Sequence, residues 1–125
     1  MVVFVSGTLS CLWDDLGFTV EHYVDLSARE IEDKLNCFAN SDHNDTDCFV
    51  CCFLAHGTLG SLSAADGKSL ELYEDIVAKF FASKCPGLHG KPKMFFFQCC
   101  RESRMTSAND VAVLIGRFVN NINRT

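Results

Sequence analysis

The chain has 125 residues, of which 48% are hydrophobic and 22% charged, and its formal net charge is -5 at pH 7. This length suits one domain with its own hydrophobic core, and the composition is typical of a globular protein. The acidic balance argues against a nucleic-acid partner, because phosphate binding needs clustered lysine and arginine. No apolar run approaches the roughly 18 residues of a membrane span, and MVVFVSG is too short for a secretion signal. We therefore expect a cytoplasmic protein with no membrane partner.

Eight cysteines occur in the chain, several of them within or beside apolar runs. Without a secretion signal, reduced thiols that pack as small hydrophobes are the better interpretation. Cys48 and Cys51 form a C-x-x-C pair, which leaves zinc or redox chemistry as an alternative. Both lie in a strand-like run whose side chains alternate between faces, and no second pair stands at zinc-site spacing. We expect neither a metal nor another cofactor.

The first part of the chain carries clear helix and strand patterns. Apolar residues at helical spacing predict a helix over 6–16, and a glycine follows it. Aromatic and β-branched residues predict a strand over 18–26. Ser27 and Glu30 form a capping box, which predicts a second helix over 27–39.

The middle of the chain changes from polar to apolar. We expect the polar connector over 40–47, with His43, to lie on the surface, like His22. The run CFVCCFLA over 48–55 is apolar throughout, which is typical of a strand covered on both faces of a parallel sheet. The turn sequence ADGKS over 65–69 predicts a small β-hairpin.

The last part begins with an apolar stripe that predicts a helix over 70–85. KMFFFQC over 93–99 predicts a second fully buried strand, with its three phenylalanines in the core. RESRMTSAND over 101–110 is a polar loop, and VAVLIGRFV over 111–119 suits a strand or a short helix. Its β-branched residues favour the strand. The whole order of elements predicts one α/β domain with a mostly parallel sheet flanked by helices.

Two of the predicted strands end in residues capable of chemistry. One ends in AHG, with His56 and Gly57, and the other ends in QCCR, with Cys100. Parallel neighbouring strands would bring His56 and Cys100 to one edge of the sheet, where active sites of α/β proteins form. An imidazole beside a thiol raises the thiolate fraction or takes the proton during attack. Gly57 would let a carbonyl oxygen approach its backbone N–H, as in an oxyanion hole. Taken alone, each residue type is more often structural in such a position.

The strand end QCCRE, with AHG upstream, resembles the caspase signature Q-A-C-[RQG]-G, whose catalytic histidine lies about 50 residues earlier. The similarity continues through LGFTVEHYVDLS, DTDCFVCCFLAHG and ADGKSLELYEDIVAKFFASKCPGLHGKPKMFFFQCC. It resembles the large subunit of initiator-type caspases over about residues 9–101, which leaves 102–125 as a divergent tail within a single domain, 1–125.

The resemblance implies a role for four residues. Cys100 matches the nucleophile and His56 the general acid/base of the dyad. Gly57 and Cys100 match the oxyanion-hole donors through their backbone amides. Gln98 matches the glutamine that lines the pocket for the aspartate of the substrate. The family needs no cofactor.

The chain also departs from the family pattern. Glu102 replaces the last glycine of the signature, and Cys99 replaces its alanine. The family's first strand, with its pocket arginine, and its small subunit have no clear counterparts. Arg117 and Arg124 are conceivable substitutes for the pocket arginines. Asp110 is either a processing site between subunits or a solvated turn residue.

Three functions are compatible with these residues. The first is a caspase-type cysteine endopeptidase in apoptosis or related proteolytic signalling, which acts on protein substrates with aspartate before the scissile bond. It would pair with a caspase small subunit or another caspase chain. The second is a non-catalytic regulator that pairs with and modulates a full caspase. The third is a chain that is not stable alone, because an unpaired sheet edge leaves apolar surface exposed.

Overall fold

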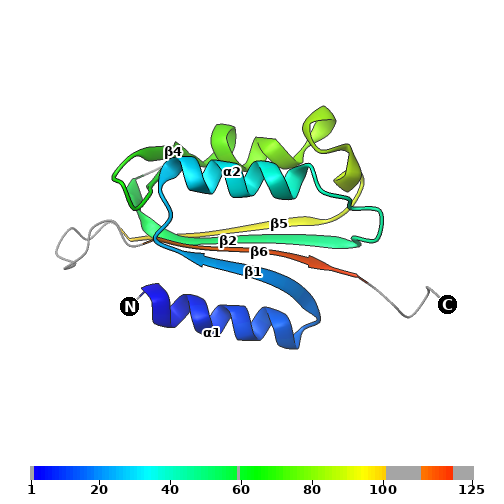
Figure 1. Ribbon diagram of the computed structural model, residues 1–125, viewed down its shortest axis with the longest axis horizontal. Coiled ribbons are helices and arrows are strands. Elements are labelled where there is room, and N and C mark those ends of the chain that lie inside the picture. The colour runs from blue at the N-terminus through cyan, green and yellow to red at the C-terminus, as the bar shows by residue number, and fades with distance from the viewer. Residues whose placement is uncertain (1, 59, 101–110, 120–125) are drawn as a thin grey trace.

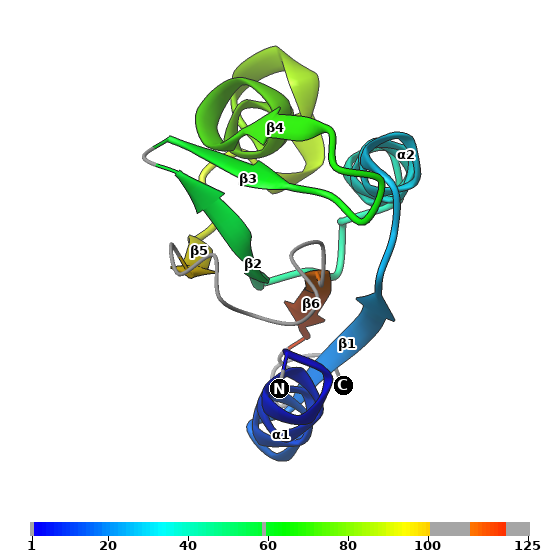
Figure 2. The ribbon, with the colours of Figure 1, turned by 90° about the vertical axis from the view of Figure 1, so that its left-hand side faces the viewer.

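The computed structural model describes residues 2–58, 60–100 and 111–119, which form three layers (Figure 1). A sheet lies in the middle, one helix covers one face, and a second helix with several short helical turns covers the other (Figures 1 and 2). The elements in chain order are α1 (Val2–Asp15), β1 (Phe18–Val24), α2 (Ala28–Ala39), β2 (Cys48–Thr58), β3 (Ser61–Ser63), β4 (Ser69–Glu71), η1 (Leu72–Ile76), η2 (Val77–Phe80), η3 (Ala82–Lys84), η4 (Pro86–Leu88), β5 (Lys93–Cys100) and β6 (Val111–Phe118). No helix in these ranges is long and apolar enough to cross a membrane.

The main sheet has the strand order β1-β6-β2-β5. β6 runs antiparallel to both β1 and β2, while β5 runs parallel to β2. The predicted α/β class is confirmed, but the expectation of mostly parallel pairing is wrong. The reason is the position of β6. The last described strand enters between β1 and β2 in the reverse direction and so separates two strands that point the same way.

Most predicted elements are present. The capping box of α2 is formed, since the Ser27 hydroxyl accepts from the Glu30 amide and the Glu30 carboxylate accepts from the Ser27 amide. The hairpin around ADGKS is the β3–β4 pair, in which Ser63 lies opposite Ser69. Residues 111–118 form a strand, as their β-branched residues predicted.

The single helix predicted over 70–85 is wrong. This segment forms one π-helical turn, η1, followed by the 3-10 turns η2 and η3. Ile76 leaves the α-helical region, with φ of -120° and ψ of -70°, and Phe81 is extended. The apolar stripe nevertheless contributes to the core, because Ile76 and Phe80 are both fully buried. The hydrogen-bond pattern changes between turns so that these side chains can reach the sheet.

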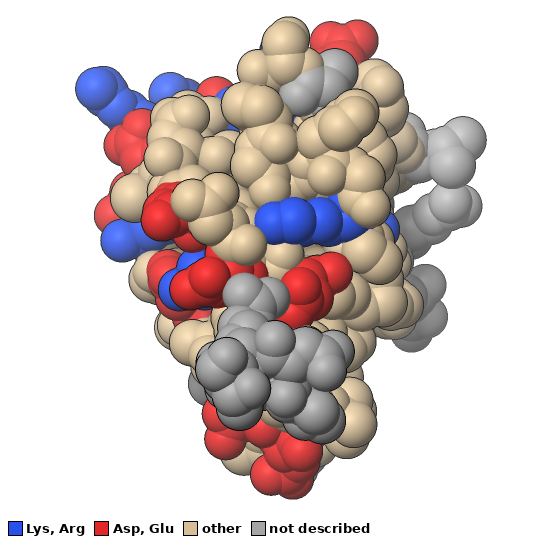
Figure 3. Space-filling model, turned by 90° about the vertical axis from the view of Figure 1, so that its right-hand side faces the viewer, with Lys and Arg blue, Asp and Glu red and all other residues tan. Residues whose placement is uncertain are grey.

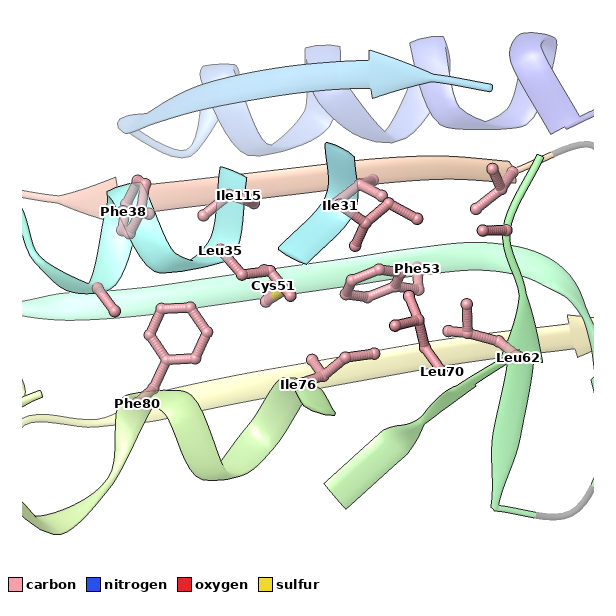
Figure 4. Packing of buried hydrophobic residues seen from close by; sticks show 14 of the residues in the cluster. Ile31, Leu35, Phe38, Cys51, Phe53, Leu62, Leu70, Ile76, Phe80 and Ile115 are labelled. Atoms are coloured by element: carbon pink, nitrogen blue, oxygen red, sulfur yellow. The ribbon is translucent and has the colours of Figure 1, made fainter. Parts of the chain in front are cut away.

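The core on the α2 face is large and mostly closed (Figure 4). Ile31 and Leu35 of α2 pack over β2, and Phe49 stacks on Phe80 with ring centroids 4.5 Å apart. The opposite, α1 face is thinner, and there Leu54 and Leu114 pack against α1. Burial of apolar surface on both faces of β2 and β6 is the main stabilising contribution to the fold.

The strand β5 differs from its prediction. Phe95 and Phe97 pack against the core on the α2 face, but Phe96 is 49% exposed on the other face. The expectation of a fully buried strand with three core phenylalanines is therefore wrong. α1 lies mainly over β1 and β6 (Figure 2), and its Trp13 ring contacts the Phe96 ring at a centroid distance of 5.9 Å, so this face of β5 is covered only in part.

The connector over 40–47 also contains a buried group. His43 is 1% exposed, so its predicted surface position is wrong, whereas His22 is exposed. The His43 ring donates from Nε2 to the Phe38 carbonyl at 2.7 Å and lies 3.1 Å from the Thr46 hydroxyl through Nδ1. The Phe38 ring packs against it. These contacts satisfy the ring and so make burial of a polar side chain possible.

Candidate active site

His56 and Cys100 occupy opposite positions on neighbouring parallel strands. The register of β2 and β5 pairs Ala55 with Cys99 and His56 with Cys100, in backbone positions at the carboxyl ends of both strands. The predicted adjacency of these two strand ends is therefore confirmed. Figure 1 shows β2 and β5 running side by side to this end of the sheet. A ligand in the crevice beyond it would meet residues from both strands.

The rigidity of β2 fixes the position of His56. Residues 49–55 immediately before it are buried, on alternating sides of the sheet. Burial ends at His56, which is half-buried. The histidine thus follows directly on a strand buried on both faces, and it is partly open to solvent, as proton exchange with a substrate requires.

Gly57 is required by close packing that the sequence did not reveal. A β-carbon at this position would lie 2.4 Å from the Ser61 carbonyl oxygen and 2.9 Å from the Leu62 α-carbon. Both contacts are with backbone, which cannot move aside as a flexible side chain can. The hydroxyls of Thr58 and Ser61 lie 3.0 Å apart in the same turn. Gly57 therefore lets β3 fold tightly onto the end of β2, which sets the direction in which the chain leaves His56.

Gln98 lies on the α1 face, opposite Leu54 of β2. It is exposed and lines a groove of about 320 Å³ whose other walls include Trp13 and Phe96. Burial raises the pKa of the Cys52 thiol on the same face, and the nearby Trp13 indole opposes this shift in part. The groove is mainly apolar. On β5 it reaches Gln98, two residues before Cys100.

Other predicted site residues lie elsewhere. Arg117 is opposite Thr19 of β1 and Phe49 of β2, at the far end of the sheet from His56. Its suggested role as a substitute pocket arginine is therefore wrong. Glu102, Asp110 and Arg124 lie outside the described residues, so their predicted roles stay predictions.

Within the described ranges, no group of three or more histidine, cysteine or acidic residues could hold a metal ion. Cys48 packs on the α1 face, and Cys51 on the α2 face. The two thiols of the C-x-x-C pair therefore cannot share one ligand, which removes the zinc and redox alternative. Burial raises the pKa of Cys51 well above its ordinary value and also raises that of Cys85. These thiols stay protonated and serve as core residues.

Comparisons with known proteins agree with this architecture. Residues 8–118 match the family model described as the caspase domain. Caspase-8 of Mus musculus is 43% identical over 95 residues, which are 76% of this chain and 20% of that protein. Caspase-6 of Mus musculus is 41% identical over 92 residues, 74% of this chain and 33% of that protein.

Solved structures show the same relationship. The structure of pro-sf-caspase-1 aligns with a TM-score of 0.72 and 37% identity, over 80% of this chain and 38% of that one. Caspase-1 from Spodoptera frugiperda aligns with a TM-score of 0.57 and 38% identity, over 65% of this chain and 31% of that one. The chain thus spans between a fifth and two fifths of the length of these relatives. The family of cysteine-type peptidases to which this chain belongs is the caspase family.

Proposed function

We propose that this chain carries the catalytic pair of a caspase-type cysteine endopeptidase that cleaves after aspartate in apoptosis or related proteolytic signalling. Cys100 is the nucleophile and His56 the general acid/base. The observation that carries the proposal is the β2–β5 register, in which these two positions are direct partners at the carboxyl edge of the sheet. Cytoplasmic location remains part of the proposal.

In this mechanism the Cys100 sulfur forms a bond with the scissile carbonyl carbon as its proton passes to the imidazole of His56. The C–N bond then breaks, and His56 returns the proton to the leaving amine. Water activated by His56 hydrolyses the thioester and regenerates the thiol. The amides of Gly57 and Cys100 donate to the oxyanion.

The proposal includes a partner that completes the site. Among the described strands, β5 pairs only with β2, so its other edge is open. On this strand Phe96 is 49% exposed. A caspase small subunit or another caspase chain that adds a strand to β5 would cover this surface and complete the aspartate pocket next to Gln98. Protein substrates with aspartate before the scissile bond then bind across the strand ends.

The same open edge favours a second candidate function. A chain that offers β5 to a full caspase could modulate that enzyme without turnover of its own. Under this alternative, pairing through β5 and the apolar groove at Phe96 would persist in a Cys100→Ala variant. The two candidates therefore differ in the need for Cys100 rather than in the surface used.

Covalent labelling tests the proposal. The chain is treated with an aspartyl chloromethyl ketone, alone and with a full-length caspase, and mass spectrometry locates the adduct. We expect the adduct on Cys100, with loss in Cys100→Ala and a strong decrease in His56→Ala. Cys37→Ala is the matched control, because Cys37 is exposed and distant in sequence from the strand ends. An adduct that survives Cys100→Ala, or no adduct under either condition, would reject the catalytic role. Altered labelling of the added caspase would then support the regulator.

A further inference from the structure

A second open edge lies at the opposite side of the sheet from β5. β1 pairs with β6 on one side, and no backbone partner of the described residues lies along its other side. The end view places β1 at the margin of the sheet, between the levels of α1 and α2 (Figure 2). An exposed strand edge presents a row of unpaired N–H and C=O groups, which an extended peptide can pair with.

A groove runs along this edge on the α2 side. It has a volume of about 390 Å³, and one wall is formed by Thr19, Glu21 and Tyr23, the alternate residues of β1. The other wall comes from α2, with Lys34. Side chains of an added strand that lie opposite these three β1 residues would project into the groove, because directly paired residues share a face of the sheet.

Charges alternate along the groove. At one end, Arg117 lies opposite Thr19 and donates through Nη1 to the backbone carbonyl of Asp42 at 3.1 Å. In the middle, the Glu21 carboxylate accepts from the Tyr23 hydroxyl, and this raises the pKa of Tyr23 to about 12. At the other end, the Lys34 ammonium lies 4.8 Å from the centre of the Tyr23 ring. The order along the strand is therefore positive, negative, positive.

The Asp42 carboxylate also lines the groove near Arg117, but it accepts from the Asn44 amide and so belongs to its own loop. Lys34, whose ammonium lies over the Tyr23 ring, is the cation at the other end of the groove. The space-filling view toward the end of the molecule where β6 ends shows acidic and basic side chains close together rather than a patch of one sign (Figure 3). A ligand matched to this surface needs both signs in a fixed spacing, which a uniform polyanion does not have.

We propose that the groove between β1 and α2 binds an extended peptide segment of another protein by strand addition to β1, with acidic residues at its first and fifth positions and a basic residue at its third. The acids lie toward Arg117 and Lys34, and the base lies opposite Glu21. Thr19 and Tyr23 are four residues apart, about 13 Å in a strand, which matches the span between the two acids. The pattern is symmetric, so it holds for either direction of the peptide.

The test uses the full chain and the fluorescent peptide Ac-Thr-Glu-Val-Lys-Val-Glu-Thr-NH2, with binding followed by anisotropy at low salt. Lys34→Glu is expected to weaken binding about fivefold or more, since it replaces an attraction with a repulsion. The charge-swapped peptide Ac-Thr-Lys-Val-Glu-Val-Lys-Thr-NH2 is expected to bind more tightly to the Lys34→Glu variant than to the unaltered chain. Lys68→Glu is the matched control, because Lys68 is exposed on the β3–β4 turn. Circular dichroism verifies that both variants are folded.

Backbone chemistry separates strand addition from simple charge attraction. Only alternate N–H groups of an added strand face its neighbour. N-methylation of the peptide at its even positions should therefore affect binding differently from N-methylation at its odd positions. We expect one of the two methylated peptides to lose binding and the other to keep it, and alternate β1 amides to gain protection from hydrogen exchange. Equal binding of the two methylated peptides would overturn the proposal. Equal affinity of the unmethylated peptide for Lys34→Glu and for the unaltered chain would overturn it as well. Concentration-dependent protection of β1 without peptide would overturn it too, by assigning the edge to a second copy of the chain.

Discussion

β5 and β6 have similar apolar sequences and occupy opposite environments. The first five residues of β6, Val111–Ile115, are each at most 1% exposed. None of the β5 residues from Lys93 to Gln98 is buried, and Phe96 is about half exposed. β6 has a strand on each side, whereas β5 has a described strand only on the β2 side. The number of neighbours, rather than apolar content, decides how deeply a strand is buried.

This difference separates two roles. β6 holds α1 and β1 to the rest of the molecule, since β1 pairs with no other described strand. β5 carries Gln98 and Cys100 and leaves one edge and part of one face for a partner. A strand that stabilises the fold must be covered on all sides, while a strand that presents a site must stay accessible. Substitutions in the two strands measure how strict that division is.

The largest expected change in the free energy of unfolding is that of Leu114→Ala, and Phe96→Ala is its counterpart on β5. Both residues are register partners of Cys52, one on each side of β2, and both lie on the α1 face. Leu114→Ala should lower the free energy of unfolding by about 2–5 kcal/mol, because it leaves a cavity in a closed environment. Phe96→Ala should cost about 1–2 kcal/mol, because half of that side chain is already in water. Urea unfolding measures both. Equal losses would contradict the comparison.

The sequence predicted local elements better than it predicted the order and direction of the strands. Local signals were sufficient for the capping box at Ser27, the hairpin turn, and the strand ends at His56 and Cys100, because each depends on neighbours in the chain. The position of β6 depends on contacts distant in sequence, such as Val113 with Phe53 and Tyr23. Apolar periodicity does not specify which strands become neighbours, so the direction of pairing and the exposure of Phe96 could not be predicted.

Buried polar groups set a second limit on prediction. Nothing in the polar run at 40–47 distinguishes His43, whose burial depends on the Phe38 carbonyl and on Gly87. A β-carbon at Gly87 would lie 3.1 Å from the His43 β-carbon, so the glycine makes room for the ring. Gly57 likewise carries a packing role, against Ser61, that only the fold reveals.

An intermediate effect on stability is expected from alanine substitution at a glycine of β6, compared with the same substitution at a glycine of α1. A β-carbon at Gly116 of β6 would lie 3.0 Å from Val20 and 3.1 Å from Val50, on the two neighbouring strands. Gly116→Ala should therefore cost about 1–3 kcal/mol through overpacking. Gly7→Ala in α1 is the control, since nothing lies within 4 Å of its new β-carbon. It should stabilise the protein by about 0.5–1 kcal/mol through helix propensity. A neutral Gly116→Ala would show that the strands around β6 can separate easily.

The smallest expected effect concerns the loop over 40–47, which contacts the start of β5 and the end of β6. Lys91, just before β5, donates to the His43 carbonyl, and the Asp47 amide donates to Phe118 at the end of β6. Burial lowers the pKa of His43 below its ordinary value of 6.5. The hydrogen bond from the His43 ring to the Phe38 carbonyl opposes this shift, and the nearby Arg117 adds to it. The unfolded chain therefore binds a proton at a higher pH than the native chain does. Stability should fall as pH decreases below about 6.5 toward the lowered pKa.

His43→Gln separates this contribution from the carboxylates that titrate in the same direction. The variant should be less stable than the unaltered chain near pH 7.5, and the difference should shrink as pH falls toward 5, because only the unaltered chain loses the neutral imidazole. His89→Gln, at an exposed position, removes a histidine without touching the buried cluster. Hydrogen exchange should show the amides at 40–47 opening first at low pH, with β6 unaffected until global unfolding. If β6 amides exchange together with the loop, the loop and the central strand form one cooperative unit, and the division between β5 and β6 is weaker than their burial indicates.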